Sequence, residues 1–280
     1  MKTKLEFLKK SFFVEKSRVK INYSMSSIHY HKSYEIYYLQ KGSVKYFIKD
    51  KVYNVKKGDL VLINTYDIHR TVYSDCSEND RIVLYFNDNF IRNIKKLEKN
   101  YDFLSKIQSS NILRLNPKQQ IIIENILIKM LKEYNSNGEE KELYLKIFLS
   151  ELLMRINRYN RENRYIDKIN PMQEKIMEVV TYINNNYSKK QSISFLAKRF
   201  SISESYLSHL FKDVTGFTVI NYINTVRIKE AQRLLINTNK TITEIANQVG
   251  FNTITHFGRV FKKSINTSPS KYRKLNRKRG

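Results

Sequence analysis

The sequence predicts an α+β multidomain fold in which a small β-barrel and a helical hairpin precede an all-α region. Residues 10–90 hold short segments rich in Tyr, Val and Ile that are separated by turns, the rhythm of a small antiparallel barrel. From Pro117 onward the apolar residues recur at helical spacing instead. Residues 172–273 have an almost continuous helical pattern, interrupted only by short turns.

Four strands are expected in the first region, each rich in the β-branched or aromatic residues that favour extended backbone. They are Glu35–Gln40, Val44–Lys49, Leu60–Ile63 and Arg81–Phe86. Turn-like breaks such as Lys57–Asp59 separate them at short intervals. Apolar and polar residues alternate only in part, which indicates a half-buried sheet. We expect Arg81–Phe86 to be its last strand.

Two apolar helices follow, Pro117–Tyr134 and Glu139–Tyr159. Proline is well tolerated at a first helical position, and Asn135–Gly138 breaks the pattern between the helices. Two apolar helices joined by a short turn form an antiparallel hairpin. This hairpin packs either on its own barrel or against the same hairpin of a second subunit, so it is a candidate dimerisation element.

These changes of pattern divide the chain into domains, since 280 residues suffice for two or three. Residues 1–116 are expected to form the barrel and residues 117–160 the hairpin. The polar stretch 161–171 is the best candidate for a linker. Residues 172–280 form the helical domain.

The chain is strongly basic, with a formal net charge of +25 and a pI of about 9.9. Residues 1–170 carry +12 and the shorter segment 171–280 carries +13, so the C-terminal part has the stronger field. An acidic polymer, with nucleic acid first, is the partner that such a charge predicts. A coding bias toward Lys, Asn and Ile would also explain it, so charge alone does not decide.

The sequence also predicts the compartment. No apolar run approaches the ~18–20 residues that span a bilayer, and Met1–Phe7 has no apolar signal core. The single cysteine, Cys76, excludes an internal disulfide framework and a cysteine-based zinc cluster. We therefore expect a cytoplasmic protein with no membrane partner.

Two segments of the C-terminal region look alike, Ile193–Lys212 and Ile242–Lys262. Each has a small residue in the middle of its first helix, Ala197 or Ala246, where two helices must approach closely. A short turn follows, and the next helix has an apolar side and a small polar side. This is the sequence form of a helix-turn-helix, whose second helix lies in the DNA major groove.

The helical region is expected to contain seven helices. Thr241 stands three residues before Glu244, which is the spacing of a capping box. One long helix of about 20 residues separates the two second helices by about 30 Å, close to the ~34 Å of a DNA turn, so both can enter successive major grooves. The expected helices are Met172–Tyr187, Ile193–Phe200, Ser203–Thr215, Val219–Thr238, Thr243–Val249, Ile254–Lys263 and Pro269–Lys274.

The second segment resembles the C-terminal signature of the AraC/XylS family of bacterial transcription regulators in Ile245–Phe251, His256–Lys263 and Ser268–Arg273. The first segment, with Leu207–Lys212 followed by Thr-Gly, is similar to the family's first motif. The resemblance covers residues 172–274 or so. It departs at Asn266, where the family usually has glycine. Because Asn tolerates left-handed backbone best among the other residues, we expect the turn to survive.

Side chains on the polar faces of the two second helices are the candidate DNA contacts, from their position and by resemblance to the family. Arginine can grip guanine at two atoms, and Ser and Thr can contact several bases. Lysines are better suited to phosphates, which fix register without reading sequence. The base-contact candidates are Ser205, Ser208, His209, Thr255, His256 and Arg259, and the phosphate-contact candidates are Lys190, Lys212, Lys262 and Lys263.

The N-terminal region resembles the first cupin motif at His29, His31, Glu35 and Gly42. Gly58 and His69 resemble the second motif, but Asn64 and Tyr66 stand where cupins often have Pro and Gly. Many AraC-family regulators have sensor domains of this kind. The resemblance therefore implies a cupin-like sensor domain with an effector pocket formed by His29, His31, Glu35, Tyr37, Tyr46 and His69.

The resemblance leaves the occupant of that site open. A cupin can bind a divalent metal, here through His29, His31, Glu35 and His69, and such donors suit iron, nickel, zinc or manganese. In the regulator family the pocket often holds an organic effector and no metal. Purely structural histidines are the third interpretation. We expect no obligatory cofactor and favour an effector pocket.

The sequence thus predicts a DNA-binding transcription regulator rather than an enzyme. Its expected partners are double-stranded promoter DNA, a small-molecule effector, RNA polymerase and a second copy of the chain. Activator is the expected class, although the residues do not distinguish activation from repression. The alternative is a metal-dependent cupin enzyme with a basic DNA-binding appendage. A nucleoid-type protein without sequence preference is a third hypothesis. A DNA-repair methyl acceptor would need a reactive cysteine, and Cys76 lies in a polar loop, which counts against it.

Overall fold

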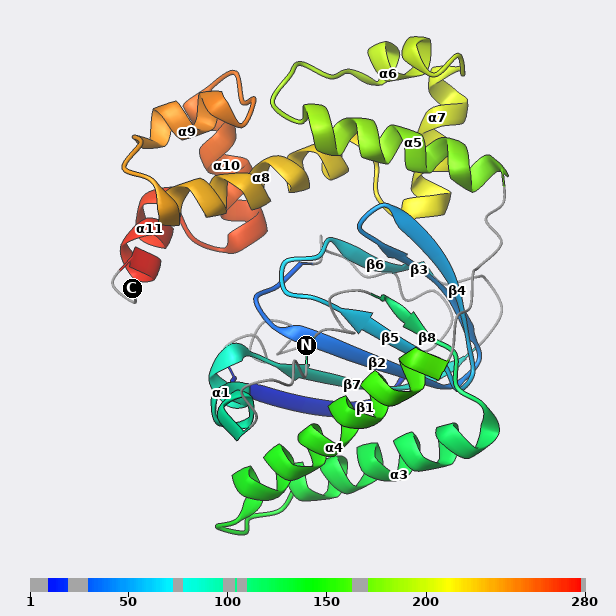
Figure 1. Cartoon of the computed structure of the whole chain (residues 1–280). Coiled ribbons are helices and arrows are strands. Elements are labelled where there is room, and N and C mark those ends of the chain that lie inside the picture. The colour runs from blue at the N-terminus through cyan, green and yellow to red at the C-terminus, as the bar shows by residue number, and fades with distance from the viewer. Residues whose placement is uncertain are drawn as a thin grey trace. The chain divides into compact units, whose positions relative to one another are not determined.

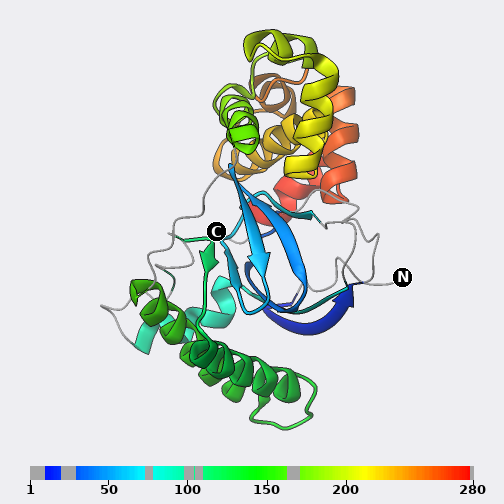
Figure 2. The same cartoon turned by 90° about the vertical axis from the view of Figure 1, so that its right-hand side faces the viewer.

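The computed structural model describes residues 10–19, 30–72, 78–97, 104, 110–162 and 171–277. The chain divides into two compact units (Figures 1 and 2). The described residues up to 162 belong to the first unit and hold the strands, and the described residues 171–277 belong to the second unit, whose regular elements are all helices. Three predictions concern residues outside the described ranges, namely those for His29, for Cys76 and for the linker, of which residues 163–170 are not described.

The N-terminal unit is built from two antiparallel sheets. In the five-stranded sheet the order is β1-β7-β2-β5-β8, and in the three-stranded sheet it is β4-β3-β6. The strands of the first sheet are β1 (Phe12–Val19), β7 (Asn79–Phe86), β2 (Tyr34–Lys41), β5 (Leu60–Ile63) and β8 (Ile112–Leu113), and those of the second are β4 (Lys51–Lys56), β3 (Ser43–Ile48) and β6 (His69–Val72).

The four expected strands are confirmed as β2, β3, β5 and β7, within two residues at each end. The expectation that Arg81–Phe86 is the last strand was wrong, because β8 follows and pairs with β5. Strands β1, β4 and β6 were not among the four expected strands. The helix α1 (Asp88–Leu97) was not expected either.

Strands β2 and β5 of the five-stranded sheet are buried on both faces, which explains the weak alternation in their sequences. Tyr37 and Leu39 on β2 pack toward the three-stranded sheet, in one apolar cluster with residues of β3 and β4. Ile36 and Tyr38 on the same strand face the other way, into a second cluster shared with the helical hairpin. Strands covered on both faces read as continuous apolar runs rather than as alternating ones.

The helical hairpin consists of α3 (Pro117–Tyr134) and α4 (Lys141–Glu162), and it packs on the five-stranded sheet of its own barrel (Figure 2). The inward face of α3 includes Ile123, Leu127 and Met130, all at most 1% exposed. Asn116 and Gln119 form a capping box that starts α3. Of the two placements that the sequence left open, the hairpin therefore takes the one within the chain.

The second unit contains the seven expected helices, and each begins and ends within three residues of its predicted bounds. They are α5 (Pro171–Asn186), α6 (Ile193–Arg199), α7 (Glu204–Thr215), α8 (Val219–Asn237), α9 (Ile242–Gln248), α10 (Ile254–Ile265) and α11 (Pro269–Arg277).

Polar caps fix the helix starts in this unit. The predicted capping box of Thr241 and Glu244 is present at the start of α9. Asn266 adopts the left-handed backbone with a φ of 58°, as expected, and ends α10.

Among the described residues, no helix has both the length and the apolar character needed to cross a bilayer.

Candidate functional site

The helix pairs α6–α7 and α9–α10 are equivalent position by position when they are aligned on their caps. Ser203 caps α7 and Thr253 caps α10, each accepting a hydrogen bond from the backbone N–H three residues later. From these caps onward, residues 203–210 and 253–260 have the same sequence of buried and exposed positions. The two second helices therefore have the same cap and the same pattern of burial, but they expose two different sets of side chains.

Buried aromatic and aliphatic residues hold each second helix in place. In α7 these are Leu207 and Phe211, and in α10 they are Phe257 and Phe261, all fully buried. Ala197 and Ala246 are also buried, in α6 and α9, where a larger side chain would force the packed helices apart. The polar side of each second helix is thereby turned outward.

Five of the six base-contact candidates are exposed, and Ser208 is half-buried. On α7, the His209 Nδ1 atom lies 3.3 Å from the Asp213 carboxylate one turn later. On α10, the ring of His256 packs edge-on against Phe251, with 5.4 Å between ring centroids. The four phosphate-contact candidates are exposed as well. This exposure is what DNA contact requires, and the contacts themselves remain predictions.

The two second helices differ in charge. Between its caps α10 carries Arg259, Lys262 and Lys263 and no acidic residue, whereas α7 carries one basic residue, Lys212, beside Glu204 and Asp213. At the position that is Lys263 in α10, α7 has Asp213. Positive side chains contribute most of the non-specific attraction to phosphates, so α10 is the more strongly attracting of the two helices.

The alignment also identifies a residue that the sequence analysis missed. Tyr206 occupies in α7 the position that His256 occupies in α10, third after the cap. Its side chain is 43% exposed and lies on the outward side of α7 with the base-contact candidates. The N-cap residues in the sequence would have revealed this equivalence had the two segments been aligned on Ser203 and Thr253.

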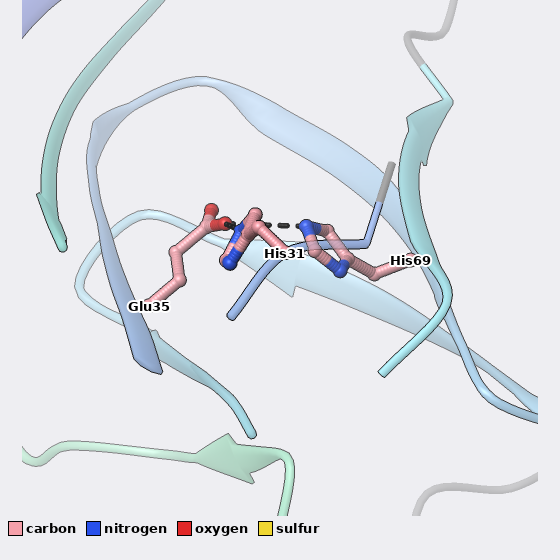
Figure 3. Close-up of side chains that lie close together, drawn as sticks. All are labelled: His31, Glu35 and His69. Atoms are coloured by element: carbon pink, nitrogen blue, oxygen red, sulfur yellow. Dashed lines mark hydrogen bonds and ion pairs between the residues drawn. The ribbon is translucent and has the colours of Figure 1, made fainter. Parts of the chain in front are cut away.

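In the N-terminal unit, His31, Glu35 and His69 converge inside the barrel (Figure 3). The Nε2 atoms of His31 and His69 lie 3.0 Å and 3.2 Å from the same carboxylate oxygen of Glu35, Oε2. Tyr46 donates its hydroxyl to the other oxygen of Glu35 at 3.1 Å. All four side chains are at most 5% exposed. The predicted pocket residues His31, Glu35, Tyr46 and His69 are therefore brought together.

Backbone carbonyls orient both imidazole rings. The Nδ1 atom of His31 lies 2.8 Å from the carbonyl oxygen of Ser33, and that of His69 lies 2.7 Å from the carbonyl oxygen of Asp67. Because a carbonyl only accepts, each Nδ1 carries a proton and each Nε2 faces Glu35. Burial alone would raise the pKa of Glu35, but hydrogen bonds from the two histidines hold that pKa well below its ordinary value.

These donors satisfy the chemical requirements of a metal site. One atom from each of His31, Glu35 and His69 lies within 4.8 Å of the others. Two imidazoles and a carboxylate suit first-row transition metals, and a backbone carbonyl on Nδ1 is the usual partner of a metal-ligating histidine. The fourth proposed ligand, His29, is outside the described residues.

Two tyrosines surround this cluster. Tyr37, which was predicted to line the effector pocket, packs edge-on against Tyr46 with 5.4 Å between ring centroids. Tyr85, which was not predicted, packs edge-on against His31 at 5.3 Å and lies opposite Glu35 in the pairing of β2 with β7. Burial first, and the Glu35 charge second, raise the pKa of Tyr85 well above its ordinary value.

Comparisons with known proteins match both units. A family described as an AraC-like ligand binding domain matches residues 18–153, and one described as a helix-turn-helix domain matches residues 196–275. The chain is 26% identical over 250 residues to an uncharacterized HTH-type transcriptional regulator of Staphylococcus aureus strain COL, covering 89% of this chain and 32% of the relative. The chain thus spans about a third of the length of that relative.

Two other relatives have lengths closer to that of this chain. YdiP of Escherichia coli K12, an uncharacterized HTH-type transcriptional regulator, is 28% identical, with 86% of this chain and 78% of the relative covered. RhaR of Mannheimia succiniciproducens, an HTH-type transcriptional activator, is 22% identical, with 88% and 86% covered. A crystal structure of apo ToxT from Vibrio cholerae is 20% identical and covers 95% of this chain and 98% of its own, with a TM-score of 0.42.

The two family matches pair an AraC-like ligand binding domain with a helix-turn-helix domain, and the relatives named above are transcriptional regulators. The chain belongs to the AraC family of these regulators. The predicted family is thereby confirmed, and none of the relatives named above is the cupin enzyme that was the alternative prediction.

Proposed function

We propose that this regulator reads a specific DNA sequence by placing α7 and α10 in successive major grooves. The observation that supports this most strongly is the equivalence of the two helix pairs, each with an exposed polar face after a polar cap. The helix between them, α8, has 19 residues and is therefore about 28 Å long, close to one DNA turn. The candidate base and phosphate contacts are those on the two outward faces.

Selection of binding sites from random duplexes tests this proposal. The full-length chain should enrich one bipartite sequence, and it should bind that sequence about a thousandfold or more tightly than random DNA at fixed salt. Equal affinity for selected and random duplexes would contradict sequence reading and would favour the nucleoid-type hypothesis, in which phosphate contacts alone matter.

We also propose that the N-terminal unit senses a small ligand at His31, Glu35 and His69, and that a divalent first-row metal ion is one candidate. The two Nε2 atoms and Glu35 Oε2 are the atoms that would hold it. A bound cation would offset the buried carboxylate charge and complete the anchoring that Ser33 and Asp67 provide. An organic effector in contact with the same residues is the other candidate.

Metal analysis separates these candidates. The purified chain is dialysed against Mn²⁺, Fe²⁺, Co²⁺, Ni²⁺ or Zn²⁺ in turn, and bound metal is measured beside thermal stability. A metal site predicts stoichiometric binding that Glu35→Gln or His69→Gln abolishes and that His256→Gln, a histidine in the other unit, leaves intact. Absence of stoichiometric metal in the unaltered chain would leave the organic effector as the proposal.

The outward face of the hairpin supports a homodimer. Ile121, Leu143 and Ile147 are 62%, 61% and 50% exposed, although the opposite faces of both helices are buried. Leu143 and Ile147 share one face of α4 because they are one turn apart. We propose that a second copy covers this face. Ile147→Lys should then shift sedimentation toward the monomer, and a chain that is monomeric at all concentrations would exclude the dimer.

For transcription itself, we propose RNA polymerase as the further partner and activation as the outcome, in keeping with the activator name of the RhaR relative. In vitro transcription from a promoter that contains the selected site tests this. The chain should raise the yield of the transcript, whereas a lower yield would identify a repressor.

A further inference from the structure

The distance between α7 and α10, the two helices proposed to enter DNA grooves, depends on how firmly each is fixed to α8. A helix alone does not fix the orientation of the modules at its two ends, because the modules can rotate about their short connections. Here the first module is α5 to α7 and the second module is α9 to α11. Within the helical unit, a segment of the first module touches the second module directly. That segment is Tyr187–Lys189, between α5 and α6.

Arg227, near the middle of α8, joins this segment to the second module. Its Nε donates to the carbonyl oxygen of Tyr187 at 2.8 Å, and a terminal nitrogen donates to the carbonyl oxygen of Lys189 at 3.0 Å. The same guanidinium lies 5.6 Å from the ring centroid of Phe251, which follows the turn between α9 and α10. One side chain thus contacts parts of both modules.

The backbone of the segment also rests on the turn of the second module. A Cβ atom added to Gly250 would lie 2.5 Å from the carbonyl oxygen of Ser188, so only glycine permits this approach. Gly250 has a φ of 93°, which also favours glycine. Tyr187 packs against the apolar core of the second module, the cluster that also contains Phe251.

We propose that Arg227 is a positioning residue that locks the two helix-turn-helix modules together and thereby sets the distance and angle between α7 and α10. A planar guanidinium can donate to two carbonyls in a fixed geometry and stack on an aromatic ring, whereas a lysine ammonium cannot do both. This inference rests on the proposed reading of two grooves, because the spacing of the readers matters only when both touch DNA.

A spacing series tests the inference in the full-length chain. Starting from the selected bipartite site, the two half-sites are moved apart or together by about one and two base pairs, against a natural repeat of ~10–10.5 base pairs. The unaltered chain should bind best at one spacing and fall steeply on either side. Arg227→Ala should lose about tenfold at the best spacing and little at the others, because preorganisation is lost while the base contacts remain.

Two variants make the comparison specific. Arg233→Ala removes another arginine of α8, which is paired with Glu230 on the same helix, and it should keep the unaltered spacing profile. Arg227→Lys keeps the charge but not the two-carbonyl fork, so it should flatten the profile as the alanine variant does. Circular dichroism checks that each variant is folded. If Arg227→Ala does not fold, the spacing profile of Arg227→Lys tests the inference in its place.

The outcomes separate the inference from the function on which it rests. If folded Arg227 variants keep the spacing profile of the unaltered chain, Arg227 does not set the spacing and the inference is wrong, while two-groove reading stands. If the unaltered chain itself has no preferred spacing, two-groove reading fails and the inference fails with it. A flattened profile for Arg227→Lys beside an unaltered profile for Arg233→Ala supports the inference.

Discussion

Asn266 and Gly216 occupy the same place in the two helix-turn-helix modules. Both have left-handed backbone, with φ values of 58° and 75°, and each donates its backbone N–H to a lysine carbonyl four residues earlier, Lys262 or Lys212. Asn is therefore a working substitute for Gly at this helix end. The chain ends both second helices with the same geometry although the residues differ.

This equivalence predicts the effect of substitutions at Asn266. Asn266→Ala should destabilise the helical unit by about 1 kcal/mol, because left-handed backbone costs a residue with an ordinary Cβ about that much. Asn266→Gly should stay within about 0.5 kcal/mol of the unaltered chain. Urea unfolding measures both. Equal losses for the glycine and alanine variants would show that the Asn side chain, and not its left-handed backbone, is what matters.

For DNA reading, the contrast between Arg259 and Lys263 on α10 is informative. Arg259→Ala should cost about 1–3 kcal/mol and relax base preference at one position, while Lys263→Ala should weaken binding to all sequences and lower the salt dependence by about one unit of slope. Titrations on single-base variants of the selected site at several salt concentrations measure this. An equal loss on every sequence for Arg259→Ala would place that residue on phosphate.

Tyr206 should read the half-site that α7 contacts. Tyr206→Ala is expected to relax preference in that half-site and to leave the half-site of α10 unchanged, and it should weaken the free energy of binding by about 1–3 kcal/mol. His256→Ala should do the reverse. The same single-base titrations provide the measurement, and a Tyr206 variant that changes both half-sites equally would argue for a structural role.

The capping box at the start of α9 predicts a pH dependence of stability. The backbone N–H of Thr241, and then its hydroxyl, lower the pKa of Glu244 below the ordinary value of 4.5. Because the pKa of Glu244 is lower in the folded state, its ionised carboxylate stabilises the fold fully above the unfolded-state pKa. This contribution is lost as the pH falls through the folded-state pKa. The difference in Tm between the unaltered chain and Glu244→Gln should therefore shrink as the pH drops below 4.5. A Tm difference that does not change with pH would contradict a stabilising role for the ionised Glu244 in the capping box.

Much of the fold could be predicted because local signals and packing agree. In the helical unit, caps such as Thr241 and the apolar periodicity mark the same boundaries, so the helices were found within three residues. In the barrel, β5 is a short apolar run between turns and was found at its true bounds. The strand β4 was missed because it is short, lies between two turns and has exposed Lys or Asn at three of its six positions, although Val52, Tyr53 and Val55 favour extended backbone.

The candidate sites were predictable to a different degree. His31, Glu35 and His69 were named from a motif, and the barrel does bring them together. Tyr85 was missed because its place beside them follows from the register of β7 on β2, opposite Glu35, which no local pattern specifies. Arg227 was missed for the same reason, since its partners at Tyr187 and Lys189 are about 40 residues away along the chain.

Protection mapping on the selected DNA tests the central proposal most directly. With the full-length chain bound, guanine N7 atoms and backbone sugars should be protected in two major-groove segments on one face of the duplex, centred about one helical turn apart. Arg259→Ala should weaken protection in only one of the two segments. A single protected segment, or protection spread evenly along the duplex, would contradict the reading of two successive grooves by α7 and α10.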